Sequence, residues 1–281
     1  MKRICNVHTT LNIVFFIIIS LLITNCSGTL TRAKRIAATA ELKSAVLNTS
    51  NFKIQSYYRF SKKGKPLTIY IEGDGQAWLT RTQPSLNPTP RNPLALKLAV
   101  LDQSKNIMYL ARPCQYINLY NEKHCSIPYW THKRFSKKII LAIDQAINIM
   151  VSRVKSKRIH LIGYSGGGAI AAMVAARRKD VASIRTLAGY MDHVALNHKA
   201  NVSQLIGSLD PIKAAPRLKK TPQIHYSGKQ DKRVPAWVLK NFIKAVGPSN
   251  CISLRKVNAT HEEGWEEVWA KIWSRIPTCR K

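Results

Sequence analysis

The chain is short of acidic residues: 14 Asp and Glu stand against 45 Lys and Arg, and the formal net charge is +31. A surface of this kind attracts anionic membranes and polyanions. The basic residues are spread along the whole sequence, and no nucleic-acid-binding motif accompanies them, so specific nucleic-acid binding is not expected. A generally basic composition of the source proteome, or an anionic membrane surface as the partner, explains this charge more simply.

The sequence also lacks internal repeats, low-complexity tracts and a CxxC pair, and no histidine pair accompanies the cysteines. The first two absences fit one domain, with a chain long enough for a single large core. The last two argue against a metal site. No metal and no cofactor is therefore expected.

The apolar run Ile13–Ile23 is too short to span a bilayer comfortably, and it follows the basic start Met1–Arg3. This pattern predicts a signal peptide over residues 1–25. Cys26 comes directly after it and resembles the lipidated cysteine of a bacterial lipobox, although Asn25 stands where a small residue is usual. Ordinary cleavage nearby or an uncleaved anchor is the alternative. A lipidated Cys26 predicts an exported, membrane-anchored, periplasm-facing protein.

Ser165 lies in the pentapeptide Gly163–Gly167, between a strand-like run, Arg158–Ile162, and a helix-like run, Ala169–Arg178. This order is typical of a nucleophile elbow, in which a sharp turn lifts a serine hydroxyl above the end of a sheet. The glycines permit a strained backbone and a close approach of neighbouring chain. A glycine-rich turn with a structural serine is the alternative interpretation.

A serine nucleophile needs a base and an orienting acid. Of the eight histidines, His261 is the best base, because it follows the strand-like run Ile252–Val257 and precedes a helix-like terminal segment, Gly264–Ile276. A histidine on such a loop can swing over Ser165. The alternative is a surface histidine that caps a helix.

The expected acid is Asp231, in a polar loop before a helix that Pro235 opens. There it can accept the Nδ1–H of His261 and fix the tautomer of the imidazole. Two other aspartates are rivals for this role. Asp192 follows the strand-like run Ile184–Ala188 and is the stronger rival, and Asp210 precedes Pro211. A helix-capping role is the alternative for Asp231.

An oxyanion hole is expected after the strand-like run Leu67–Ile71, in the turn Glu72–Gly75. The backbone N–H groups of Asp74 and Gly166 are the predicted donors to a reacting carbonyl. Glu72 can anchor this loop by accepting local N–H groups. An ordinary strand-end turn is the alternative.

These motifs together resemble the α/β-hydrolase superfamily, from about Leu67 to the C-terminus. The segments that carry the resemblance are Glu72–Gly75, Gly163–Gly167, Gly228–Pro235 and His261–Trp265. Three further stretches are similar to a bacterial group of exported, lipoprotein-type α/β-hydrolases, namely Tyr70–Trp78, Asn87–Pro93 and Tyr109–Tyr116. Esterases of the superfamily often have a histidine where this chain has Glu72.

The resemblance implies acyl transfer, with a small-molecule or lipid ester as substrate and a Ser165–His261–Asp231 triad that forms an acyl-enzyme. The narrower group does not fix the substrate. An acyltransferase with the same triad, or a non-catalytic protein tethered to a membrane, is the alternative function.

We expect the α/β fold class, with a mainly parallel sheet, helices on both faces and a small cap from residues 189–222. The resemblance implies one hydrolase domain over residues 51–281, and we expect a monomer. Residues 26–50 are expected to form a tether, with a helix over Thr31–Leu47. The pattern predicts a hairpin of Phe52–Phe60 with Leu67–Ile71, and a long helix over Arg134–Val154.

Four cysteines remain beyond Cys5 and Cys26, and an even number in an oxidising compartment predicts two disulfides. Local pairing joins Cys114 to Cys125 and Cys251 to Cys279. The second bridge would pin the terminal helix and, with it, the position of His261.

Overall fold

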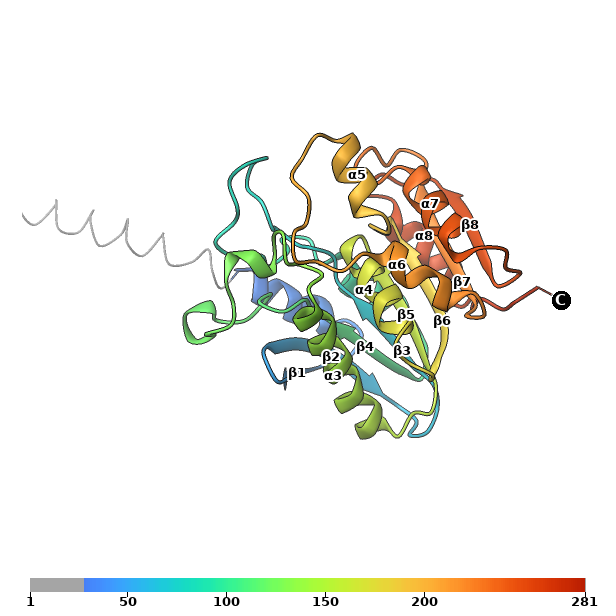
Figure 1. Ribbon diagram of the computed structural model, residues 1–281. Helices are drawn as coiled ribbons and strands as arrows, with labels where there is room; N and C mark the ends of the chain where they lie inside the picture. The colour runs from blue at the N-terminus through green and yellow to red at the C-terminus, as the bar shows by residue number, and fades with distance from the viewer. Residues whose placement is uncertain (1–27, 281) are drawn as a thin grey trace, which may run out of the picture.

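An eight-stranded sheet forms the centre of the computed structural model, which describes residues 28–280 (Figure 1). The strands lie in the order β1-β2-β4-β3-β5-β6-β7-β8. Their bounds are β1 Lys43–Asn48, β2 Lys53–Phe60, β3 Leu67–Ile71, β4 Asn106–Leu110, β5 Ile159–Tyr164, β6 Val181–Leu187, β7 Gln223–Gly228 and β8 Ile252–Val257. The six strands from β4 to β8 in this order are mutually parallel, and β1 and β2 join as antiparallel strands at one edge.

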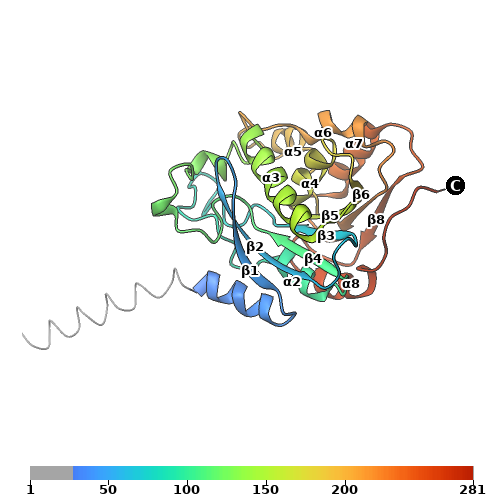
Figure 2. The ribbon, with the colours of Figure 1, turned by 90° about the horizontal axis from the view of Figure 1, so that it is seen from below.

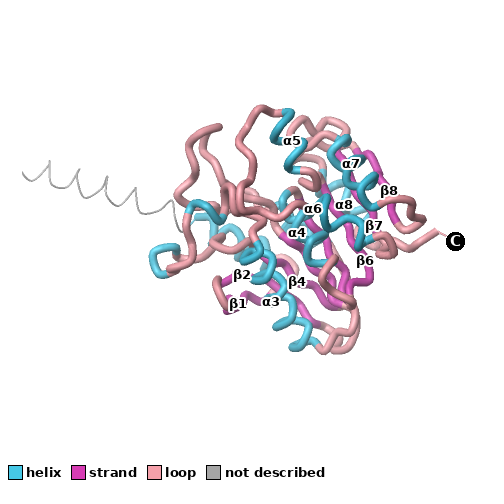
Figure 3. The backbone as a smooth tube through the Cα atoms, viewed as in Figure 1, coloured by secondary structure: helices cyan, strands magenta, loops and turns pink. Residues whose placement is uncertain are grey.

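Helices cover both faces of the sheet, as the sequence predicts. The labelled helices are α2 Leu94–Leu101, α3 Lys137–Val154, α4 Gly166–Ala175, α5 His193–Lys199, α6 Pro211–Ala214, α7 Ala236–Val246 and α8 Trp265–Ile272, with the short 3₁₀ turns η1 Leu119–Asn121, η2 Ile127–Tyr129 and η3 Ala215–Leu218. Residues 28–38 are also helical. Long connections join β3 to α2 and β4 to α3, and the second of them contains only the short turns η1 and η2. Loops make up a large part of the fold (Figure 3).

The two faces have separate hydrophobic cores. One core contains α3, α4 and α7, and the other contains α2, α8 and the helix of residues 28–38 (Figure 2). Strands β3, β4 and β5 are buried along their whole length because helices cover them on both sides. Their sequences are accordingly runs of apolar residues without the alternation of a half-exposed strand.

The strand register brings together loops that are far apart in the sequence. Ile71 at the end of β3 pairs with Gly163 of β5, and Gly228 at the end of β7 pairs with Val257 of β8. The residues that follow each strand therefore meet at one edge of the sheet. In open parallel sheets this carboxyl edge is where ligands bind.

The predicted hairpin of β2 with β3 is wrong. Strand β4 lies between them, antiparallel to β2 and parallel to β3. The hairpin partner of β2 is β1, which it joins through a tight turn closed by a hydrogen bond from Thr49 N–H to the Phe52 carbonyl. The local apolar pattern identified the strands, but pairing depends on residues that are distant in the sequence.

The helix predicted over Thr31–Leu47 is correct for only its first half. The helical segment ends after residue 38, and Glu41 has a φ of 56°. The chain then reverses into β1, so Lys43–Asn48 forms the edge strand of the sheet instead of a helix or a tether. Leu47 is the one buried side chain of this strand and Ala45, two residues earlier on the same face, is half-buried, which suits an edge strand with one face towards the core.

The signal peptide and the lipidation site expected at residues 1–26 lie outside the described residues. Within residues 28–280, no helix has the length and hydrophobicity required to cross a membrane.

Both predicted disulfides are present, joining Cys114 to Cys125 and Cys251 to Cys279. The second one links the start of β8 to the segment after α8. The chain between these cysteines contains His261, so this bridge closes the unit that carries it. Disulfides of this kind persist in oxidising compartments.

Replacing Cys251 and Cys279 together with serine should lower the free energy of unfolding by about 3.6 kcal/mol, because the unfolded chain regains the entropy of an open loop. The matched pair, Cys114→Ser with Cys125→Ser, spans a sequence separation of 11 instead of 28. Its loss should be about 0.8 kcal/mol smaller in the chain-entropy model. Urea unfolding under non-reducing conditions measures both values. An unchanged midpoint in the first pair would contradict the expectation.

Candidate active site

The elbow around Ser165 is a strained turn between β5 and α4. Ser165 has φ 49° and ψ −119°, a conformation that side-chain-bearing residues rarely adopt. A Cβ on Gly163 would lie 2.3 Å from the Gly167 carbonyl oxygen, and one on Gly167 would lie 2.2 Å from the Ile71 carbonyl oxygen. Glycine at these two positions is therefore a steric requirement. It allows the elbow to pack directly against the end of β3.

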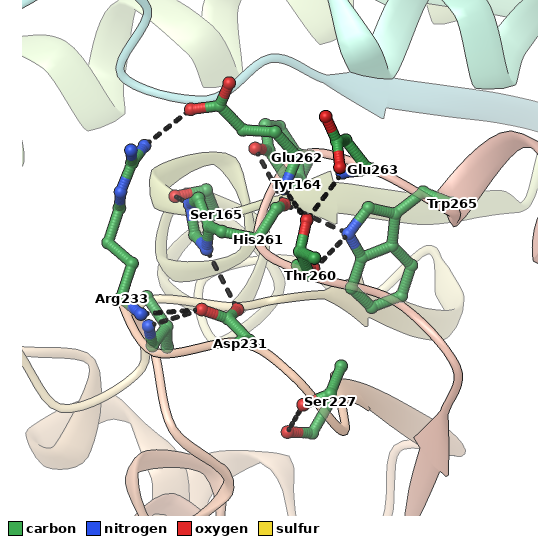
Figure 4. Close-up of polar contacts among 12 residues, drawn as sticks. Tyr164, Ser165, Ser227, Asp231, Arg233, Thr260, His261, Glu262, Glu263 and Trp265 are labelled. Atoms are coloured by element: carbon green, nitrogen blue, oxygen red, sulfur yellow. Dashed lines mark hydrogen bonds and ion pairs between the residues drawn. The ribbon is translucent and has the colours of Figure 1, made fainter.

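Three side chains from different loops form a hydrogen-bonded chain at this elbow (Figure 4). Nε2 of His261 lies 3.1 Å from Oγ of Ser165, and Nδ1 of His261 lies 2.9 Å from Oδ2 of Asp231. Ser165 is partly exposed, whereas His261 and Asp231 are buried. The imidazole is thus held between a hydroxyl and a carboxylate.

Contacts on the far side of Asp231 and His261 set the orientation of these hydrogen-bonded side chains. Oδ1 of Asp231 accepts hydrogen bonds from the backbone N–H groups of Arg233 and Val234, at 2.9 and 2.8 Å. The His261 carbonyl accepts from the Tyr164 hydroxyl at 3.1 Å and from the indole N–H of Trp265 at 3.0 Å. Both the acid and the histidine loop are therefore anchored on the side away from Ser165.

The two rival aspartates have other partners. Asp192 begins α5, where it accepts from the Ala195 N–H, and its second oxygen accepts from the side chain of Asn241. Asp210 begins α6 and accepts from the Ile212 N–H. Both act as helix caps, the role in which aspartate is favoured at a helix start.

The loop after β3 lies against the elbow. A Cβ on Gly166 would come within 2.1 Å of Oδ1 of Asp74, and one on Gly73 within 3.5 Å of the Ser165 Cβ. In the described part of the chain, neither the Asp74 nor the Gly166 backbone N–H has a hydrogen-bond acceptor. The two predicted oxyanion donors are thus neighbours with free N–H groups.

A cavity of about 520 Å³ opens above Ser165 and His261. This volume suits a small organic ligand. The lining comes from residues 72–78, residues 90–92, Arg134, Tyr164, Ser165, Arg233, His261 and Glu262. The segment expected as a cap, residues 189–222, contributes α5, α6 and η3 to the fold but no residue to this lining.

Comparison with solved structures identifies the architecture. An esterase from Pyrococcus furiosus superposes with a TM-score of 0.58 over 84% of this chain and 91% of its own, at 16% sequence identity. The chain has the α/β-hydrolase fold.

Two further hydrolase-fold structures are similar at the same level. Est1E from Butyrivibrio proteoclasticus matches with a TM-score of 0.55 at 15% identity, covering 81% of this chain and 94% of its own. An acylaminoacyl peptidase from Pyrococcus horikoshii matches with a TM-score of 0.61 at 14% identity, over 86% of this chain but only 42% of that longer one. No family model and no curated protein matches the sequence.

Sequence reasoning missed the residues that hold the loop after β3, which contains Asp74. Asp74 forms ion pairs with Arg112 at 2.9 Å and with Arg134 at 2.6 Å. Burial raises the pKa of Asp74, but the two guanidinium groups outweigh burial and the pKa lies below its usual value. Arg112 belongs to a stretch that was singled out only for its family resemblance, and no local signal marked Arg134.

The peptide between Gly73 and Asp74 is held from the other side by an amide side chain. Nε2 of Gln115 donates to the Gly73 carbonyl at 3.1 Å, and Oε1 of Gln115 accepts from the Arg112 N–H at 3.0 Å. Because a peptide unit is planar, fixing the Gly73 carbonyl also fixes the direction of the Asp74 N–H.

Glu72 anchors the same loop, as the alternative for this residue anticipated. Its Oε1 accepts from the Gly73 N–H at 2.9 Å and from the Ala95 N–H at 3.3 Å, and the Tyr109 hydroxyl donates to its Oε2 at 3.2 Å. Burial raises the pKa of Glu72 to about 7, although these hydrogen bonds act in the opposite direction. Among residues 28–280, no cluster of three or more His, Cys, Asp or Glu side chains is arranged to hold a metal ion.

Glu72 should make the stability of the protein depend on pH. Its pKa is raised from 4.5 to about 7 in the folded state, so its contribution to stability is complete below the unfolded value and is lost as pH rises through about 7. A shift of this size corresponds to about 3 kcal/mol. The Glu72→Gln variant should lose less stability than the wild type between about pH 5 and about pH 8. Urea unfolding at both pH values tests this; parallel pH profiles would refute it.

Proposed function

We propose that this protein is a serine hydrolase that cleaves a carboxylic ester through an acyl-enzyme. The observation that supports this proposal most directly is the hydrogen-bonded chain from Ser165 through His261 to Asp231, with distances of 3.1 and 2.9 Å. A serine, a base and an orienting acid in this geometry form the arrangement that activates a hydroxyl for acyl transfer. Similar folds that are named esterases support the choice of substrate class.

In the proposed reaction, Nε2 of His261 takes the proton of Ser165 as Oγ attacks the ester carbonyl carbon. Asp231 accepts the Nδ1–H and stabilises the imidazolium that results. The carbonyl oxygen becomes an oxyanion that accepts from the N–H groups of Asp74 and Gly166. The alcohol leaves with the proton from His261. A water molecule, deprotonated by the same histidine, then releases the acid and restores Ser165.

The proposal includes the place where the enzyme acts. Two disulfides support an oxidising compartment. Lipidation of Cys26 and attachment to a membrane surface follow from the N-terminal sequence pattern and lie outside the described residues. Radiolabelled fatty acid incorporation, with Cys26→Ser as the control, distinguishes lipidation from ordinary cleavage.

The Ser165→Ala variant should lose reaction with a fluorophosphonate probe and lose hydrolysis of short-chain para-nitrophenyl esters, because the nucleophile is removed. Asp231→Asn should reduce kcat by about 10⁴-fold, since the wrong imidazole tautomer is then favoured. Ser203→Ala, at an exposed serine, is the matched control and should react normally. Probe attachment to the folded Ser165→Ala protein would disprove the assignment of the nucleophile.

Gln115 should matter for kcat although it touches no substrate. Gln115→Glu keeps the shape and the acceptor for the Arg112 N–H but removes the donor to the Gly73 carbonyl. The Asp74 N–H then loses its fixed direction, and we expect kcat to fall by about ten- to a hundredfold with a smaller change in KM. Gln103→Glu, at an exposed position before β4, makes the same chemical change as a control. A wild-type kcat in Gln115→Glu would show that this contact does not position the donor.

A further inference from the structure

The two walls of the cavity above Ser165 differ in charge. On the wall near His261, Arg233 is paired with Glu262 at 2.6 Å, so the pair is neutral overall. On the wall near the oxyanion loop, the single carboxylate of Asp74 is shared by the guanidinium groups of Arg112 and Arg134. This wall therefore carries an excess of positive charge.

Arg91 adds to that excess. It lines the same cavity and follows Pro90, which packs against Gly75 of the loop after β3. Its side chain is exposed, and within residues 28–280 it has no ion-pair partner. The remaining acid on this wall, Glu72, is turned towards the protein interior, where its oxygens accept from Gly73, Ala95 and Tyr109. Its charge acts on the buried Arg112, and among the described residues it forms no ion pair with Arg91 or Arg134, the two arginines of this side that line the cavity.

Arg134 is held in a fixed orientation with one side open. Its Nε donates to the Thr131 carbonyl at 2.7 Å and its Nη1 donates to Asp74 Oδ2 at 2.6 Å. Its own carbonyl accepts from Arg112. In the part of the chain that the structure describes, Nη2 has no acceptor, and the side chain is 13% exposed where it lines the cavity. A guanidinium fixed in this way loses little entropy when it binds a carboxylate or phosphate.

We propose that this wall binds an anionic group of the substrate, so that the preferred ester carries a carboxylate or phosphate in its acyl or its alcohol part. Arg134 contacts this group through Nη2, and Arg91 contributes a second cation at the cavity mouth. The proposal depends on the ester hydrolysis proposed above. It adds the chemical class of the substrate, which the fold does not determine.

Two matched pairs of esters test the inference and distinguish the two positions of the charge. Para-nitrophenyl hydrogen adipate and para-nitrophenyl methyl adipate differ only in whether the far end of the acyl chain is charged. Butyryl glycerol phosphate and monobutyrylglycerol differ in the same way on the alcohol side. We expect kcat/KM to be about tenfold or more higher for the anionic member of one pair, and we expect this preference to fall as sodium chloride is added.

The ratio of kcat/KM between the two members of a pair is the readout for variants, because Arg134 also holds Asp74 and its loss changes the absolute rate. Arg134→Gln and Arg91→Gln should each reduce the ratio several-fold. Lys63→Gln removes the same charge from the exposed turn before β3, at the amino ends of the parallel strands and away from the site. This variant should leave the ratio unchanged. Arg91→Gln keeps the test valid if Arg134→Gln does not fold.

The outcomes separate the two proposals. If none of the four esters is hydrolysed, the proposed function is contradicted. If neutral esters are hydrolysed and neither anionic member is preferred, or if the preference persists in both arginine variants, the anion site is overturned while the proposed function stands. The pair that shows the preference identifies whether the anionic group lies on the acyl or the alcohol side.

Discussion

The close approach of the elbow to the end of β3 is the constraint on which the site depends. Gly167 packs against the Ile71 carbonyl so tightly that no side chain fits between them. This contact fixes Ser165 relative to the loop that begins at Glu72, although the two are far apart in the sequence. A strained residue such as Ser165 persists only where its surroundings determine its conformation. Here those surroundings are the sheet register and the glycines.

The chain has 14 acidic residues, and most of their carboxylates accept a hydrogen bond or form an ion pair. Asp192 and Asp210 begin helices, and Asp144 and Asp180 pair with Arg178. Glu72, Asp74 and Asp231 are concentrated at the carboxyl edge of the sheet. The excess of basic residues in the whole chain is therefore smaller at the site. There Asp231 holds His261, and Glu72 and Asp74 hold the loop after β3. Among the described residues that line the cavity, Arg91 has no ion-pair partner, and Arg134 shares the carboxylate of Asp74 with Arg112.

The sequence predicted what local patterns encode. The elbow, the histidine after the last strand and both disulfides were found because each has a short-range signature of residue type and spacing. The β2–β3 hairpin was wrong because strand order depends on β4, which comes much later in the chain. Arg134 and Gln115 were missed for the same reason. Nothing near them in the sequence indicates that they meet Asp74 and Gly73.

Arg134 and Gln115 show that two different parts of the fold build the site. The parallel strands bring the triad loops together, but the irregular segment between β4 and α3 supplies Arg112, Gln115 and Arg134. This segment is cross-linked by Cys114–Cys125 and tied to the neighbouring loop by hydrogen bonds from the Trp130 indole to the Ser85 carbonyl and from the Tyr116 N–H to Thr89. A loop without regular structure can position an N–H group only if its own conformation is fixed. The disulfide and the buried hydrogen bonds provide that rigidity, so the same segment both holds the loop after β3 and places Arg134 in the cavity lining.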